Sequence, residues 1–174
     1  MLAKIADACL LAGCTAGGIF ILSCLDKLHM PYLSDYGLED IKFYCPPMAA
    51  IAINLFKEST LPGINNTFIG VIIGCVICVL TVDIGPLFLG NDTMMLRTAS
   101  AGISIFTMKM VGHVSPPGAS LAVLFIDNKA FQSGLGRFYV FTPGVTGTLA
   151  LYVLALIKVE VQSMLGSSAK VKAS

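Results

Sequence analysis

Long apolar runs, separated by short polar segments, set the pattern of this chain. Four runs are long enough to form helices that cross a hydrocarbon layer about 30 Å thick, which takes roughly 20 helical residues. They cover residues 8–25, 64–82, 94–112 and 138–157. Two shorter apolar runs, 46–56 and 116–126, would each form a helix only about 16 Å long. Neither short run is expected to span the layer alone.

Both short runs begin with a pair of prolines. Ser115 precedes Pro116-Pro117 at an N-cap position, and the prolines fill the first helical positions, where a missing N–H costs nothing. The segment from Pro46 to Phe56 matches the one from Pro116 to Ile126 without a gap, at an offset of 70 residues, with both prolines and two alanines coinciding. This correspondence predicts an internal repeat. Paired short segments of this kind are a sequence indication of a transporter's binding site.

Each half of the chain therefore has a long, a short and a long apolar segment, at about residues 8–82 and 94–157, before a polar tail at 158–174. The sequence predicts one all-α membrane domain, a helical bundle of four long spans and two short Pro-Pro-started helices arranged as two repeats. If the short helices cross the membrane, the halves are inverted; if they re-enter, the halves are parallel. Residues 83–92, which contain Gly85-Pro86, are expected to form a loop between the halves.

The composition indicates a membrane protein. Hydrophobic residues make up 56% of the chain and charged residues 12%, against about 25% charge in ordinary soluble domains. Since unpaired backbone is not tolerated in lipid, a helical, multi-pass protein follows. The net charge of +1 and the absence of a basic tract give no indication of nucleic-acid binding. No catalytic motif is present, so an enzyme is not expected.

Six cysteines lie mostly within the apolar runs. Cys75 and Cys78 fall in the middle of a predicted span with no histidine or acid nearby to complete a metal site. We expect them to be small apolar helix residues rather than metal ligands or disulfide partners.

The two short helices provide the candidate site. A helix start near the bilayer midplane exposes unpaired N–H groups and the positive end of the helix dipole, so two facing starts would bind an anion. Ser115 could donate its hydroxyl, and the small residues after the prolines would let an ion approach the backbone. The alternative is that the prolines only end the preceding loop. The candidate residues at the two starts are Pro46, Pro47, Ser115, Pro116, Pro117, Gly118 and Ala119.

Four other polar residues are candidates for the same site. Lys109 and His113 are four residues apart, on one face of the preceding span if it stays helical that far. Lys109 would attract an anion, and His113 would titrate beside it. Alternatively, Lys109 reaches the headgroup region and His113 lies in a wet loop. Asn54 and Asn65 could hydrogen-bond an ion or the neighbouring backbone.

Three stretches resemble the HPP family of integral membrane proteins. They are Lys109-x-x-x-His113-Val-Ser115-Pro-Pro-Gly-Ala, the segment Pro46 to Phe56, and Leu61-Pro62-Gly-Ile-Asn65-Asn66, and the resemblance covers about residues 46–158. It implies a small helical membrane protein and a probable transporter, with plant-type members linked to nitrite movement across the chloroplast envelope. Ser115 stands where the family has histidine. The chain therefore either uses His113 with a shifted geometry or lacks that contact.

Two functions are compatible with these observations. The first is a carrier or channel for a small inorganic anion, with nitrite favoured by the resemblance. The second is a structural accessory subunit of a photosynthetic or respiratory membrane complex, in which His29 or His113 could ligate chlorophyll, or the chain could contact carotenoid. The resemblance favours a plastid membrane, envelope or thylakoid, over another organelle or the plasma membrane. A homo-oligomer is expected from the small number of spans.

Overall fold

Helices make up nearly all of the chain that the structure, a computed structural model, describes. The described residues are 2–34, 45–127 and 144–171. Their helices are α1 (Leu2–Ser34), α2 (Pro46–Lys57), α3 (Leu61–Leu89), α4 (Thr93–Val111), α5 (Pro116–Asp127) and α8 (Thr146–Val171). The predicted all-α class is confirmed over these residues, and both short helices begin at the first proline of their pair.

Within the described residues, three helices are long and apolar enough to cross a membrane. The candidate spans are Asp7–Leu28 in α1, Leu61–Leu89, which is all of α3, and Thr146–Met164 in α8. Helix α4 has 19 residues, but it is less apolar and carries Arg97 and Lys109. Three of the four predicted spans thus overlap candidate spans, whereas the fourth span and the repeat arrangement stay predictions.

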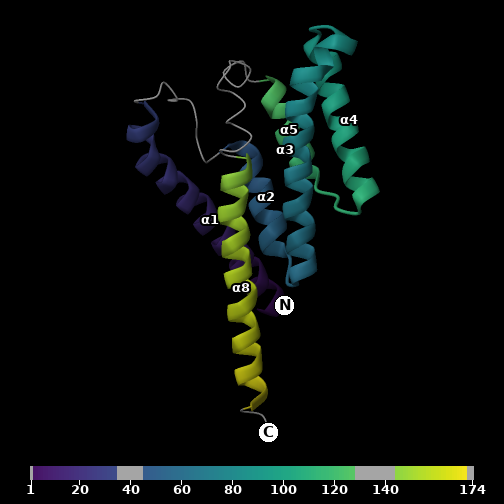
Figure 1. The fold of residues 1–174 in the computed structure, drawn as a ribbon. Helices are drawn as coiled ribbons and strands as arrows, with labels where there is room; N and C mark the ends of the chain where they lie inside the picture. Colours follow the sequence, from purple (N-terminus) through teal and green to yellow (C-terminus); the bar gives the residue numbers. More distant parts are fainter. Residues whose placement is uncertain (1, 35–44, 128–143, 172–174) are drawn as a thin grey trace.

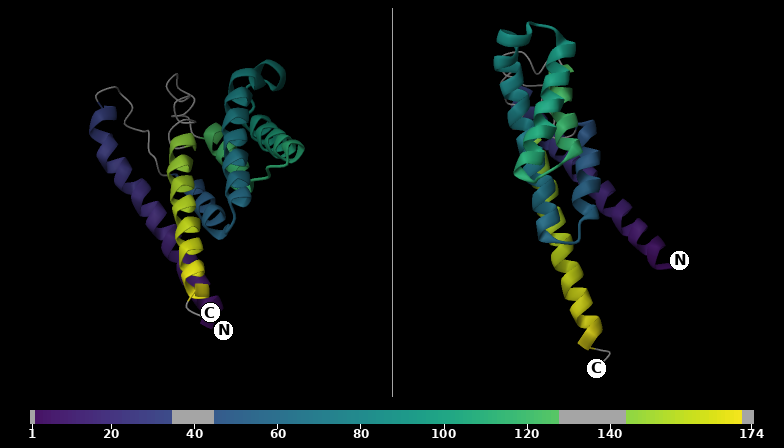
Figure 2. Two further views of the ribbon diagram at one scale, coloured as in Figure 1. Left: turned by 60° about the horizontal axis from the view of Figure 1, so that its bottom comes forward. Right: turned by 90° about the vertical axis from the view of Figure 1, so that its right-hand side faces the viewer.

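Consecutive helices run in opposite directions. In Figure 1, α1, α3 and α5 run upward in the view, whereas α2, α4 and α8 run downward. Helices α3, α4 and α5 pack against one another, and α2 packs against α1, α3, α5 and α8. The two short helices therefore lie in contact, and α8 projects beyond the other helices at the lower end (Figures 1 and 2).

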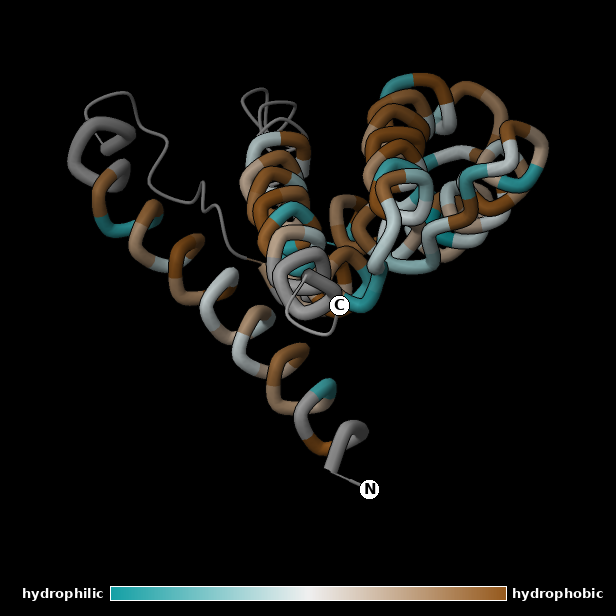
Figure 3. Tube along the Cα trace, turned by 90° about the horizontal axis from the view of Figure 1, so that it is seen from below, coloured by the Kyte–Doolittle hydropathy of each residue, from teal (hydrophilic) through white to brown (hydrophobic). Residues whose placement is uncertain are grey.

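Helix α2 fills the centre of the core. Its side chains Met48, Ile51 and Leu55 are completely buried. Gly18 lets α1 approach this core, because a Cβ at that position would lie 3.0 Å from the ring of Phe56. Many large apolar side chains are exposed, among them Phe20 on α1 and Val153 on α8, and Figure 3 shows hydrophobic residues along both of these helices. Exposed apolar side chains on the outer surface suit contact with lipid.

Helix α3 is longer than the sequence predicts. The prediction of a loop at 83–92 is wrong, because the helix continues through Pro86 to Leu89 and only Gly90 to Asp92 form the turn. Proline removes one backbone donor, a loss that membrane helices tolerate when neighbouring groups compensate. The turn has its own signals: Gly90 has a φ of 66°, and the Asp92 carboxylate accepts the Met94 N–H at 2.9 Å.

The end of the chain also differs from the prediction. The span expected at 138–157 begins in residues outside the described part, and its helix α8 continues to Val171, through most of the segment expected as a polar tail. Lys158 helps to join this extension to the core. Its ammonium donates to the Phe56 carbonyl at 2.6 Å and to the Glu58 carbonyl at 3.3 Å, at the C-terminal end of α2.

Candidate functional site at the start of helix α5

The link between α4 and α5 is a tight, glycine-ended turn. Gly112 has a φ of 82°, in the left-handed region, and ends α4 at Val111. The N–H of His113 then reaches back to the Met108 carbonyl at 2.8 Å. His113 is therefore outside the helix, and the condition under which it would share a helical face with Lys109 is not met. Lys109 is exposed in the last turn of α4, and His113 is half-buried.

The first four residues of α5 have no free backbone N–H. Pro116 and Pro117 have no N–H, and the next two amides, of Gly118 and Ala119, donate to the Ser115 carbonyl at 2.9 and 3.3 Å. A helix start normally leaves four N–H groups without a helical partner. Here the prolines lack an N–H and the Gly118 and Ala119 amides bond to the Ser115 carbonyl, so residues 116–119 offer an anion the positive end of the helix dipole but no free amide.

The hydroxyl of Ser115 takes no part in this bonding. The side chain is 1% exposed, and its oxygen has no hydrogen-bond partner among the described residues. An N-cap hydroxyl normally accepts the N–H of the second or third helical residue. The second residue here is Pro117, and the N–H of the third, Gly118, already donates to the carbonyl of Ser115. An unpartnered buried hydroxyl costs about 1–3 kcal/mol.

Helix α2 begins in the same way. Cys45 is buried before Pro46-Pro47, and its carbonyl accepts the Met48 N–H at 2.8 Å. Pro47 is half-buried, as is Asn54 further along the helix. The side chain of Pro46 lies outside those that the structure describes.

Two glycines of α3 bring its backbone against the start of α5. A Cβ on Gly70 would lie 2.5 Å from Ser115 Cβ and 2.6 Å from the His113 carbonyl oxygen. A Cβ on Gly74 would overlap the carbonyl group of Gly118, and one on Gly118 would lie 2.9 Å from Val71 Cα. Such spacing of small residues permits close helix packing in membranes. The pair Gly70 and Gly74 thus seats Pro117, Gly118 and Ala119, all buried, on α3.

Polar side chains of α3 connect this region to the rest of the bundle. Nδ1 of His113 lies 2.7 Å from Oδ1 of Asn66, and the two form a hydrogen bond. The neighbouring Asn65 accepts the hydroxyl of Tyr152, on α8, at 2.7 Å. Adjacent asparagines on α3 therefore bind two different elements. Tyr152 was not predicted as a site residue, because its partner Asn65 lies 87 residues away in the sequence.

Replacing Tyr152 with phenylalanine should lower stability modestly. The change removes the hydrogen bond to Asn65 but keeps the ring, which packs against Phe68 with centroids 4.6 Å apart. A lost bond of this kind costs about 1 kcal/mol, or roughly 3 °C in melting temperature for a chain of this size. Thermal unfolding in detergent measures the change. Tyr152→Leu, which also loses the ring contact, should fall further; equal melting of Tyr152→Phe and wild type would contradict the bond.

Two other buried hydroxyls lie on α4. Leu96, Ser100, Ser104 and Met108, spaced four residues apart, form its buried face. The oxygens of Ser100 and Ser104 are fully buried without a partner among the described residues. The Met108 methyl group lies 3.0 Å from the position of a Cβ on Gly118, so this face reaches the start of α5. The spacing of the serines was the only sequence signal for them.

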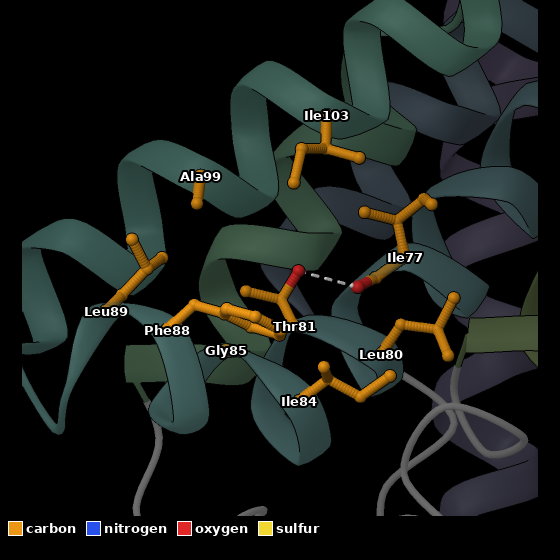
Figure 4. Close-up of a pocket in the computed structure, with 9 residues that line it drawn as sticks. All are labelled: Ile77, Leu80, Thr81, Ile84, Gly85, Phe88, Leu89, Ala99 and Ile103. Carbon is orange, nitrogen blue, oxygen red and sulfur yellow. Dashed lines mark hydrogen bonds between the residues drawn. The ribbon is translucent and has the colours of Figure 1, made fainter.

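An apolar groove between α3 and α4 is a different kind of site. Figure 4 shows it lined from α3 by residues such as Ile77, Thr81 and Phe88, and from α4 by Ala99 and Ile103. The Thr81 hydroxyl donates to the Ile77 carbonyl at 2.8 Å. The Thr81 hydroxyl therefore has no free hydrogen to donate to an anion. The apolar lining of the groove suits a lipid chain instead.

The structure thus defines a small helical membrane protein with a proline-started inner helix, and the comparison with family models agrees. The model described as "HPP, transmembrane region" matches residues 3–165. The chain belongs to the HPP family of membrane proteins, and the resemblance inferred for about residues 46–158 is confirmed and extends over α1. No curated protein and no solved structure matches the chain.

Proposed function

We propose that this protein is an integral membrane carrier or channel for a small inorganic anion, with nitrite as the first candidate. The observation that carries the proposal is the hydroxyl of Ser115, which is buried at the start of α5 and has no hydrogen-bond partner among the described residues. An anion that accepted a hydrogen bond from it would remove the cost of the unpartnered group and interact with the positive end of α5.

Neighbouring groups support an anion at this position. The His113–Asn66 pair lies beside it, since both His113 and Ser115 approach Gly70 on α3. Lys109 is exposed one turn before the link and would attract anions toward it. In this arrangement His113 takes the place of the family histidine from two residues earlier, and the Ser115 hydroxyl takes the role of the donor next to Pro116.

The order of the helices supports two inverted repeats. The helices of the first half run up, down and up in Figure 1, and those of the second half run down, up and down. In both halves the residue before the proline pair is buried, and its carbonyl accepts the N–H of the third residue of the short helix. Inverted repeats with short central helices are typical of transporters that expose a site alternately to each side.

A second function, that of a structural accessory subunit, is favoured by one observation. The start of α5 is packed against α3 so closely that Gly118 and Gly74 touch through their backbones, which leaves no space for an ion between them. Such a subunit would use its exposed apolar surface to bind partners in a photosynthetic or respiratory complex. His113 is the described histidine that could ligate a pigment, although it is bonded to Asn66; the side chain of His29 lies outside those described.

Uptake into liposomes tests the first function. Liposomes containing the purified chain should take up nitrite in a saturable manner, with nitrate and chloride tested as competitors. Lys109→Ala should lower uptake at low ionic strength and have a smaller effect at high ionic strength, because salt screens an exposed charge. Uptake no greater than in empty liposomes, from protein shown to be helical and monodisperse, would reject transport of these ions and favour the accessory subunit.

A further inference from the structure

A groove at the lower end of the bundle, away from the α5 start, combines basic and apolar side chains. It has a volume of about 390 Å³ and lies between α1, the end of α2 and α8. Its polar residues are Asp7, Lys57, Ser59, Lys158 and Gln162, and its apolar residues include Leu10, Leu11 and Phe56.

The groove lies where the candidate spans end. Asp7 is the first residue of the α1 span, and Ser59 lies in the short link just before the α3 span begins at Leu61. Gln162 is near the end of the α8 span at Met164. Three elements thus place this groove at one boundary of the hydrocarbon layer, at the level of lipid headgroups.

The charges in the groove favour an anion. Lys158 is half-buried, and its ammonium donates to two neutral backbone carbonyls, so its positive charge is not neutralised by these bonds. Lys57 adds a second, exposed positive charge. The carboxylate of nearby Glu58 is turned toward the start of α3, where it occupies the space beside Gly63. Asp7 is the one acidic residue among those that line the groove.

We propose that this groove binds the phosphate of an anionic phospholipid, with Lys57 and Lys158 on the headgroup and Leu10, Leu11 and Phe56 along the glycerol and upper acyl chains. The apolar wall favours a lipid over a free anion, because a free anion gains nothing from contact with leucine and phenylalanine. Basic residues at the membrane surface attract anionic lipids, and basic pockets between helices bind their headgroups.

Lipid titration of the full chain in detergent tests the site. Native mass spectrometry should show tighter binding of phosphatidylglycerol than of phosphatidylcholine. Lys57→Gln should weaken phosphatidylglycerol binding about fivefold, the effect expected of one basic residue near an anionic headgroup. Asp7→Asn should strengthen it, because it removes the carboxylate that opposes the phosphate. Both positions are exposed, so the fold should be unaffected, which circular dichroism checks.

Lys27→Gln is the matched control, since Lys27 is an exposed lysine near the other end of the α1 span. An equal loss in Lys27→Gln and Lys57→Gln, or equal binding of the two lipids by wild type, would overturn the proposal. Displacement of phosphatidylglycerol by millimolar inorganic phosphate would assign the groove to a free anion instead. The assay measures no transport, so its result is independent of the test of anion uptake.

Discussion

Replacing Gly74 with alanine is expected to destabilise the protein more than any other single methyl group added to the described helices. The new Cβ would overlap the carbonyl group of Gly118 and would lie 2.6 Å from the carbonyl carbon of that residue. Both contacts are with backbone, so no side chain can rotate away, and α5 must move off α3. Overpacking of this severity costs about 3 kcal/mol, which corresponds to a melting temperature lower by roughly 10 °C.

Gly102→Ala is the control for this substitution. Gly102 is also in a helix, but a Cβ there would have nothing within 4 Å, and alanine is the better helix former. Its melting temperature in detergent, followed by far-ultraviolet circular dichroism, should equal or exceed that of wild type. Equal melting of the Gly74→Ala and Gly102→Ala proteins would contradict the backbone contact between α3 and α5.

The short helices could be predicted to within a residue because their signals are local. The proline pairs define where α2 and α5 begin, and the next charged residues, Lys57 and Asp127, define where they end. The loop at 83–92 was mispredicted from equally local signals. Gly85-Pro86 is typical of a turn, but a helix that packs along its length tolerates a proline, and Gly85 instead gives Leu96 of α4 room to approach.

The site depended on contacts that no local pattern encodes. The motif Gly70-x-x-x-Gly74 predicts close packing but not its partner, which is the start of α5. His113 and Asn66 are 47 residues apart, and they meet only because α5 docks on α3. The sequence correctly predicted that the helix begins directly after Ser115. That its carbonyl, rather than its hydroxyl, would take the first free amide follows from the turn geometry and was not predictable from residue type.

The Ser115→Ala variant separates the two functions because it should lower transport without lowering stability. Alanine keeps the Cβ that packs against Gly70 and removes a buried hydroxyl that has no partner in the described part of the chain. The fold should therefore be retained, with stability unchanged or higher by about 1 kcal/mol. If the hydroxyl donates to the anion, the loss of a hydrogen bond to a charged group, worth about 1.5–3 kcal/mol, should lower nitrite uptake roughly tenfold or more.

Ser120→Ala provides the matched control on the same helix. Ser120 is exposed, and its hydroxyl donates to the Pro117 carbonyl at 2.8 Å, so the substitution removes a serine hydroxyl from α5 without touching the proposed anion position. Its uptake should match that of wild type at equal amounts of reconstituted protein. A Ser115→Ala protein that is as stable as wild type and transports nitrite equally well would show that the anion does not use this hydroxyl. The close packing of Gly118 on α3 would then be the better guide to function, and binding to partner subunits would become the property to measure.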